Sequence, residues 1–150
     1  MVVQVPDIRY ARSGDLRIAY QTWGEGPPVL YIADLVSHVE ITWEHELYRR
    51  SLEHTGRHVT FAWFDKRGIG MSDRFDDAPT LEQRNQDILA VMNTLGWERA
   101  HIVGQSEGAI MAQATYSPKP VRRSWRAPWR SPGRWRSGRR SPGPQPRSRA

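Results

Sequence analysis

Residues 101–110 read HIVGQSEGAI, with a serine between two glycines that each stand two positions away from it. The pattern Gly-x-Ser-x-Gly is typical of a sharp turn that leads from a strand into a helix and exposes a nucleophilic serine at its tip. Such a turn strains the backbone of the serine, and bulky neighbours two residues away would clash. Glycine therefore suits both Gly104 and Gly108.

The segments on either side of this pattern favour a turn between a strand and a helix. Residues 99–103, RAHIV, are strand-like, and residues 107–116, EGAIMAQATY, are helix-like. We therefore predict that Gln105 lies within the turn, that Ser106 is a catalytic nucleophile, and that the backbone N–H of Glu107 donates to an oxyanion. The alternative is a glycine-rich turn with a solvated serine.

The chain up to about residue 117 alternates strand-like and helix-like segments. Short apolar or alternating runs predict strands at residues 8–11, 16–22, 27–34, 58–65 and 99–103. Helical spacing of apolar residues predicts helices at residues 37–56, 79–97 and 107–116. This alternation implies an α/β fold with about five strands, mostly parallel, and flanking helices. We assign residues 1–117 to this domain.

Two of the predicted helices carry end signals. The helix at 79–97 begins with a capping box of Thr80 and Gln83, and Gly96 is expected to end it. Leu81, Ile88, Met92 and Leu95 share one face of this predicted helix. The helix at 37–56 is expected to end at Gly56 in a left-handed conformation. Its predicted apolar face consists of Val39, Trp43, Leu47, Tyr48 and Leu52.

Basic and acidic residues are unevenly distributed. Of the 22 Lys and Arg residues, eleven lie at residues 119–150, whereas all 16 Asp and Glu residues precede that segment. The first 118 residues therefore carry 11 basic and 16 acidic side chains, although the whole chain has a formal net charge of +6. Residues 118–150 are rich in Arg, Ser, Pro and Trp, so we predict a disordered tail there.

The chain contains no cysteine, which excludes disulfides and thiolate chemistry and fits a reducing compartment. No apolar stretch approaches the roughly eighteen residues of a membrane span. The first residues, MVVQVPDIRY, lack the pattern of a signal peptide. We therefore expect a cytoplasmic protein.

Residues 64–74, FDKRGIGMSDR, form a basic glycine-rich segment after a predicted strand. The segment lacks the spacing and the Lys-Ser/Thr pair of a P-loop, so we discount a phosphate site. Together with VGQSEG at 103–108, it resembles the α/β-hydrolase superfamily, and the likeness extends over roughly residues 7–116. Residues 9–32 and 37–53 resemble a narrower bacterial branch, found as lone hydrolases or beside nucleotide-cyclase or transcription-regulator domains.

The resemblance implies roles for individual residues. Ser106 would be the nucleophile, and the N–H groups of Glu107 and Leu35 would bind the oxyanion. Asp34 stands where the family usually has glycine, and a carboxylate there would repel developing negative charge unless it points away. A structural loop close to the serine turn would consist of Asp65, Arg67, Gly68 and Gly70. Neither a cofactor nor a metal is implied.

The family's catalytic acid and histidine follow the serine in the chain. No Asp, Glu or His follows Glu107 here, and all five histidines precede Ser106: His38, His45, His54, His58 and His101. A serine hydroxyl is a poor nucleophile unless a base accepts its proton. His38 is the best-placed substitute by position, with a surface role as the alternative. The other histidines are expected to face solvent or to support structure.

The change of composition after residue 117 has three interpretations. An out-of-frame or truncated C-terminus would produce this mixture, because Arg, Trp, Pro, Ser and Gly can all be written with GC-rich codons. A functional tail would bind nucleic acid or an anionic membrane through its charge and through Trp125, Trp129 and Trp135. A basic tail without a role is the third interpretation.

The resemblance implies a serine hydrolase that cleaves a small-molecule ester, lactone or thioester through an acyl-Ser106 intermediate. Because the triad is incomplete, we expect this chain to have weak activity or none. Serine at the turn disfavours a dehalogenase, which uses aspartate there. A non-catalytic sensor or binding domain is the alternative. The strand at 99–103 should leave an open apolar edge that promotes self-association.

Overall fold

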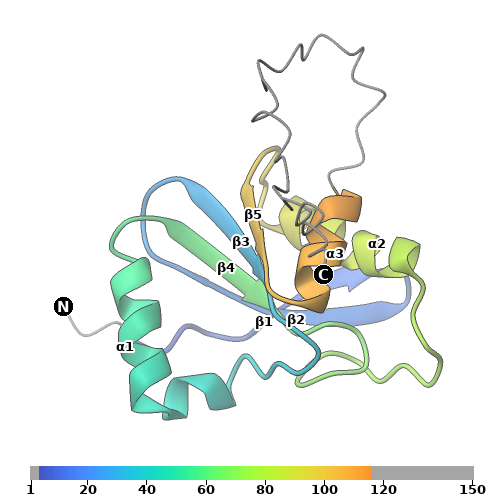
Figure 1. The fold of residues 1–150 in the computed structure, drawn as a ribbon, viewed down its shortest axis with the longest axis horizontal. Coiled ribbons are helices and arrows are strands. Elements are labelled where there is room, and N and C mark those ends of the chain that lie inside the picture. Colours follow the sequence, from blue (N-terminus) through green and yellow to red (C-terminus); the bar gives the residue numbers. More distant parts are fainter. Residues whose placement is uncertain (1–3, 116–150) are drawn as a thin grey trace, which may run out of the picture. The chain divides into compact units, whose positions relative to one another are not determined.

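The computed structural model describes residues 4–115, which form one five-stranded sheet with flanking helices (Figure 1). The strands are β1 (Arg9–Ser13), β2 (Leu16–Trp23), β3 (Pro28–Ile32), β4 (Thr60–Phe64) and β5 (His101–Gly104). The helices are the short 3-10 helix η1 (Ile41–Glu44), α1 (Glu46–Thr55), α2 (Leu81–Thr94) and α3 (Glu107–Thr115). The predicted tail and the predicted domain boundary near residue 117 lie outside the described residues.

The sheet is mixed, with the strand order β1-β2-β4-β3-β5. β3 pairs in parallel with both β4 and β5, whereas β2 pairs antiparallel with both β1 and β4. Four strands therefore run in one direction and β2 alone opposes them, which confirms a mostly parallel sheet. Because β3, β4 and β5 are parallel, their carboxyl ends meet at one edge of the sheet, where α/β folds place ligand sites.

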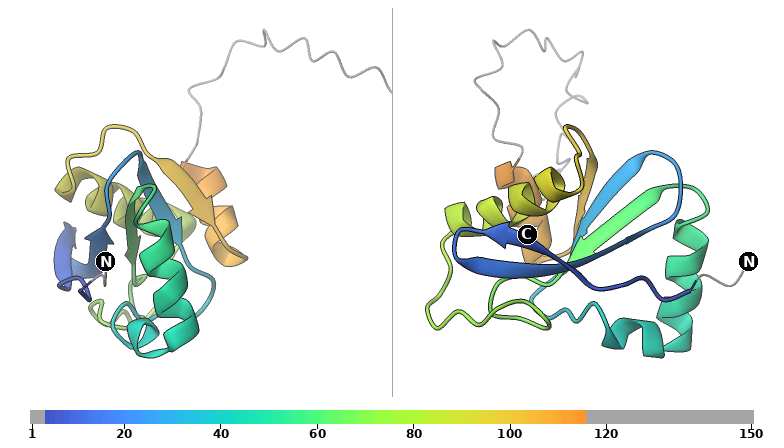
Figure 2. Two further views of the ribbon diagram at one scale, coloured as in Figure 1. Left: turned by 90° about the vertical axis from the view of Figure 1, so that its left-hand side faces the viewer. Right: turned by 180° about the vertical axis from the view of Figure 1, so that it is seen from behind.

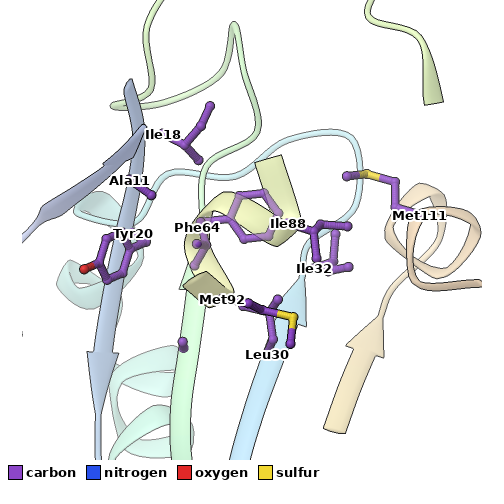
Figure 3. Close-up of a cluster of buried hydrophobic side chains, with 11 residues drawn as sticks. Ala11, Ile18, Tyr20, Leu30, Ile32, Phe64, Ile88, Met92 and Met111 are labelled. Carbon is purple, nitrogen blue, oxygen red and sulfur yellow. The ribbon is translucent and has the colours of Figure 1, made fainter. Parts of the chain in front are cut away.

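Helices cover both faces of the sheet (Figure 2). Alternating side chains of β2 belong to two separate core clusters. Ile18 and Tyr20 pack in a first cluster with Ile88 and Met92 of α2. Ala19 and Trp23 belong to a second cluster. Figure 3 shows the first cluster, which also receives Met111 of α3. The second cluster lies on the opposite face, with Val39, Trp43 and Trp63. The three central strands β2, β3 and β4 thus contribute apolar side chains to both layers, as strands covered on both faces do.

The first half of the predicted helix 37–56 is wrong. Residues 37–40 form a loop, η1 follows, and His45 in an extended conformation (φ −84°, ψ 114°) separates it from α1. Residues 37–40 are not helical because the Asp65 carboxylate binds them. It accepts hydrogen bonds from the Ser37 hydroxyl (2.7 Å) and the Val39 N–H (3.1 Å). These bonds hold the segment near the sheet in a non-helical path.

Two further details of that helix differ from the prediction. Leu47 and Tyr48 do not belong to an apolar buried face, because α1 begins only after the break and both side chains are exposed. Gly56 is right-handed, with a φ of −65°. Glycine is required there for space instead, since a Cβ atom would lie 2.6 Å from the indole ring of Trp23.

The prediction for α2 is confirmed at both ends. Thr80 and Gln83 form the capping box, and Gly96 adopts a φ of +69° just after the helix. Of the apolar residues on its shared face, Ile88 and Met92 are buried, whereas the Leu81 side chain is 44% exposed. The guanidinium of Arg67 lies against this first turn and donates to the Gln83 carbonyl (2.9 Å).

Within residues 4–115, no helix has both the length and the hydrophobicity needed to cross a membrane.

Candidate active site

The serine turn connects β5 directly to α3. Ser106 has a φ of 52° and is the only residue other than glycine with a positive φ among the described residues. The N–H of Gln105 donates to the Ile32 carbonyl of β3 (3.0 Å), and the N–H of Gly108 donates to the Gln105 carbonyl (2.8 Å). The turn is therefore fastened to the neighbouring strand and holds Ser106 in a strained conformation.

Both glycines of the pattern lie where no side chain fits. A Cβ atom on Gly104 would lie 2.3 Å from the carbonyl oxygen of Gly108, and one on Gly108 would lie 2.2 Å from the carbonyl oxygen of Ile32. These neighbours are backbone atoms, which cannot rotate away as a side chain could. The spacing of the glycines thus follows from close packing of the turn against the ends of β3 and β5.

Asp34 and Leu35 follow β3 at the same edge of the sheet. The Asp34 carboxylate accepts a hydrogen bond from the Val36 N–H (3.3 Å), and the Leu35 side chain is exposed. The Asp34 carbonyl accepts a hydrogen bond from the Lys66 ammonium. This carbonyl and the N–H of Leu35 belong to one planar peptide group, so the contact with Lys66 constrains both.

Glu107, the first residue of α3, forms a charged cluster with Lys66 and Arg84. Lys66 Nζ lies 2.6 Å from Glu107 Oε2, and Arg84 forms an ion pair with Glu107 Oε1. The hydrogen bond from Lys66 and the positive charges of Lys66 and Arg84 lower the pKa of the Glu107 carboxyl, although partial burial opposes them. The sequence analysis missed Lys66 and Arg84, since only the Glu107 N–H was considered.

Asp65 fixes the loop that follows β4. Besides binding Ser37 and Val39, its carboxylate accepts a hydrogen bond from the Met71 N–H (2.9 Å). Asp65 is fully buried, and Gly70, with a φ of 53°, lies directly against the carboxylate. The side chain therefore joins the β3–α1 loop to the β4 loop.

Arg67 and Gly68 anchor the other side of this loop. The Arg67 guanidinium binds the Asp87 carboxylate of α2 with two hydrogen bonds (2.8 and 2.7 Å). Gly68 adopts a φ of 80°, a conformation that favours glycine. The loop thus packs against α2 on one side, while its Lys66 contacts the residue after Ser106.

A pocket of about 740 Å³ lies beside the serine turn, between α1 and the sheet. Its lining includes the aromatic side chains Tyr31, Phe61 and Trp63 from the strands, and Gln105 from the turn. The Tyr31 hydroxyl donates to the Gln105 side chain. Burial, followed by the nearby charge of Asp34, raises the pKa of the Tyr31 hydroxyl. Gln105 lines the pocket but Ser106 does not, so the serine lies outside its wall.

No histidine at residues 4–115 forms a hydrogen bond with Ser106. His38 lines the pocket, and its Nδ1 accepts a hydrogen bond from the Ile41 N–H (3.3 Å). This contact ties the Nδ1 atom to the backbone of the loop and not to Ser106. The other four histidines are exposed. Across the described residues, no group of three or more His, Asp or Glu side chains is arranged to hold a metal ion.

The sequence is similar to the protein named "Putative carbamate hydrolase RutD" from Azorhizobium caulinodans, with 27% identity over 115 residues. Similar solved structures include an epoxide hydrolase, VrEH1, from Vigna radiata (TM-score 0.60, 22% identity) and an α/β hydrolase fold protein from Burkholderia ambifaria (TM-score 0.57, 23% identity). No family model matches the sequence.

These matches cover most of this chain but a minor part of each relative. The match to the A. caulinodans protein covers 75% of this chain and 41% of that protein. The match to VrEH1 covers 73% of this chain and 35% of that protein, and the match to the B. ambifaria protein covers 75% and 38%. The chain therefore spans about two fifths of the length of the relatives that it matches. At the identities of the two solved structures, the similarity concerns the fold.

Proposed function

The described part of this chain has the fold of the N-terminal part of an α/β hydrolase, and from that premise we propose that Ser106 is the nucleophile of an acyl-transfer site. The observation that carries the proposal is the strained Ser106 (φ 52°) in a turn that excludes side chains on both sides. Non-glycine residues adopt this conformation at a cost of about 1–2 kcal/mol, which packing or function must offset.

In the proposed reaction, Ser106 Oγ attacks the acyl carbon of an ester, a lactone or a thioester. The carbonyl oxygen becomes an oxyanion, which accepts hydrogen bonds from the N–H groups of Glu107 and Leu35. The bond to the leaving alcohol or thiol then breaks as that group takes up the proton that Ser106 released. Water then hydrolyses the acyl-Ser106 ester, which releases the acid and returns a proton to Ser106 Oγ. A carbamate also has an acyl carbon, so the name of the A. caulinodans relative adds carbamates to the candidate substrates.

Within residues 4–115 no histidine is hydrogen-bonded to Ser106, and no histidine follows Glu107 in the sequence. We therefore propose that this chain supplies the nucleophile and the oxyanion donors but lacks the base. A serine without a base reacts slowly, so the expected activity is low.

The test is hydrolysis of short-chain nitrophenyl esters by the full chain, with and without added imidazole as an external base. We expect imidazole to increase the rate of the wild-type chain above the rate of Ser106→Ala, which accounts for the direct reaction of imidazole with the ester. Equal rates for the two proteins at every imidazole concentration would refute nucleophilic catalysis by Ser106. That result would favour the alternative of a non-catalytic binding or sensor domain.

A further inference from the structure

Lys66 contacts both segments that carry the proposed oxyanion donors. Its side chain is 3% exposed, and its Nζ atom lies 2.6 Å from the Glu107 carboxylate. The same Nζ donates to the Asp34 carbonyl. The segment after β3 and the start of α3 are distant in the sequence, so this single buried ammonium joins a loop to the first residue of a helix at the carboxyl edge of the sheet.

The contact with Asp34 determines the direction of the Leu35 N–H. A trans peptide group is planar, and its C=O and N–H bonds point in opposite directions. When Lys66 holds the Asp34 carbonyl, the N–H of Leu35 points away from the ammonium. Within residues 4–115, the Leu35 N–H donates no hydrogen bond of its own, so the peptide is held by the Lys66 contact to its carbonyl and by the Asp34 carboxylate, which binds the Val36 N–H on the other side.

The contact with Glu107 acts on the second donor. Glu107 is the first residue of α3, where backbone N–H groups lack partners within the helix. Its carboxylate is held between Lys66 and Arg84, which fixes the first turn of the helix against the loop after β4. The ammonium therefore restrains both N–H groups at once, whereas Arg84 restrains only Glu107.

We propose that Lys66 is a positioning residue that sets the distance and direction between the N–H groups of Leu35 and Glu107. This inference rests on the proposed function, since it explains how the oxyanion site would be kept in place. Burial of an ammonium is unfavourable unless hydrogen-bonding acceptors replace water. The Glu107 carboxylate and the Asp34 carbonyl are two such acceptors, and they lie on the two segments that must be held.

The test compares Lys66→Met, which removes the ammonium but keeps the aliphatic stem, with Arg84→Met in the full chain. The measurement is the ¹⁵N relaxation order parameter of the Leu35 amide. We expect a rigid value of about 0.85 in the wild type and in Arg84→Met, and a value below about 0.6 in Lys66→Met. An unchanged Leu35 amide in Lys66→Met, or an equal loss in Arg84→Met, would overturn the proposal.

The kinetic constants of Lys66→Met test whether the loss of the ammonium also weakens catalysis. In the imidazole-supported ester assay, Lys66→Met should lower the Ser106-dependent kcat at least about tenfold with KM nearly unchanged, because oxyanion donors act mainly in the transition state. A rise in KM alone would contradict this role. If Ser106→Ala proves as active as the wild type, the proposed function fails, whereas the order parameters still decide whether Lys66 orients the Leu35 peptide.

Should Lys66→Met fail to fold, Lys66→Gln provides the second variant. Its amide can donate hydrogen bonds but is shorter and uncharged, so it cannot reproduce both contacts of the ammonium. We expect the order parameter of the Leu35 amide to fall in this variant while the core amides stay rigid. A rigid Leu35 amide in Lys66→Gln would overturn the proposal.

Discussion

Gly70 lies against the carboxylate of Asp65 so closely that a Cβ atom on Gly70 would be 2.1 Å from Oδ2. The carboxylate is already bound to Ser37, Val39 and Met71, so it cannot withdraw without losing hydrogen bonds. The hydrogen bonds of Asp65 to Ser37 and Val39 connect the glycine-rich segment to the loop after β3. It explains in steric terms why the loop near the serine turn needs glycine at this position.

Gly70→Ala should therefore be strongly destabilising. We expect the free energy of unfolding to fall by more than about 3 kcal/mol, from left-handed strain and from displaced buried hydrogen bonds. Gly14→Ala is the matched control, because Gly14 has a similar φ of +61° with no atom within 4 Å of the added Cβ. Denaturant unfolding should show a loss of only about 1 kcal/mol there. Equal losses would show that the Asp65 contact is unimportant.

The strain at Ser106 predicts that glycine is more favourable than alanine at this position. Ser106→Gly should be more stable than Ser106→Ala by about 1 kcal/mol, because glycine adopts a positive φ without steric cost. At Ser51, an exposed position in α1, the order should reverse, since glycine is unfavourable inside a helix. Chemical denaturation of the four variants measures both differences. A Ser106→Gly protein less stable than Ser106→Ala would contradict the strained turn.

The depressed pKa of Glu107 predicts a pH dependence of stability. Its carboxylate is favoured in the folded state by Lys66 and Arg84, so the folded pKa lies below the ordinary value of 4.5. The contribution to stability is therefore complete above that value and is lost as the pH falls through the folded pKa. Unfolding at a series of pH values should show that Glu107→Gln differs most from the wild type near neutral pH. A difference independent of pH would refute this coupling.

The position of β5 predicts self-association. β5 pairs with β3 alone among the described strands, and the side chains of His101 and Val103 are exposed. An unprotected edge strand can pair with another chain, and a lysine on it disfavours such pairing. Size-exclusion chromatography with light scattering should detect association that rises with concentration and weakens in Val103→Lys. Leu47→Lys, on the exposed side of α1, is the control and should have no effect. A monomer at all concentrations would contradict the prediction.

Local patterns in the sequence were sufficient to predict the strands, the capping box of α2 and the strand-to-helix turn. Alternation along residues 16–23 also separates the two faces of the sheet, although Gln21 on one of them is buried. There it accepts hydrogen bonds from the indoles of Trp43 (2.8 Å) and Trp63 (3.0 Å). No local pattern reveals that a polar side chain will be buried between two distant tryptophans.

The remaining errors and omissions have the same origin in long-range contacts. Helical spacing predicted one helix at 37–56, but hydrogen bonds to Asp65 keep its first residues out of the helix. Lys66 and Glu107 lie 41 positions apart, so their ion pair follows from the pairing order of β3, β4 and β5. The predicted tail, including Trp125, Trp129 and Trp135, lies outside the described residues, and binding of nucleic acid or membranes through it stays a prediction.

Covalent labelling tests the central claim, that the turn presents a reactive serine, most directly. The full chain would be incubated with a fluorophosphonate, with and without imidazole, and digested for mass spectrometry. The account predicts an adduct on the peptide that contains Ser106, formed faster with imidazole and absent in Ser106→Ala. A folded protein that gains no adduct at Ser106 under either condition would contradict the account.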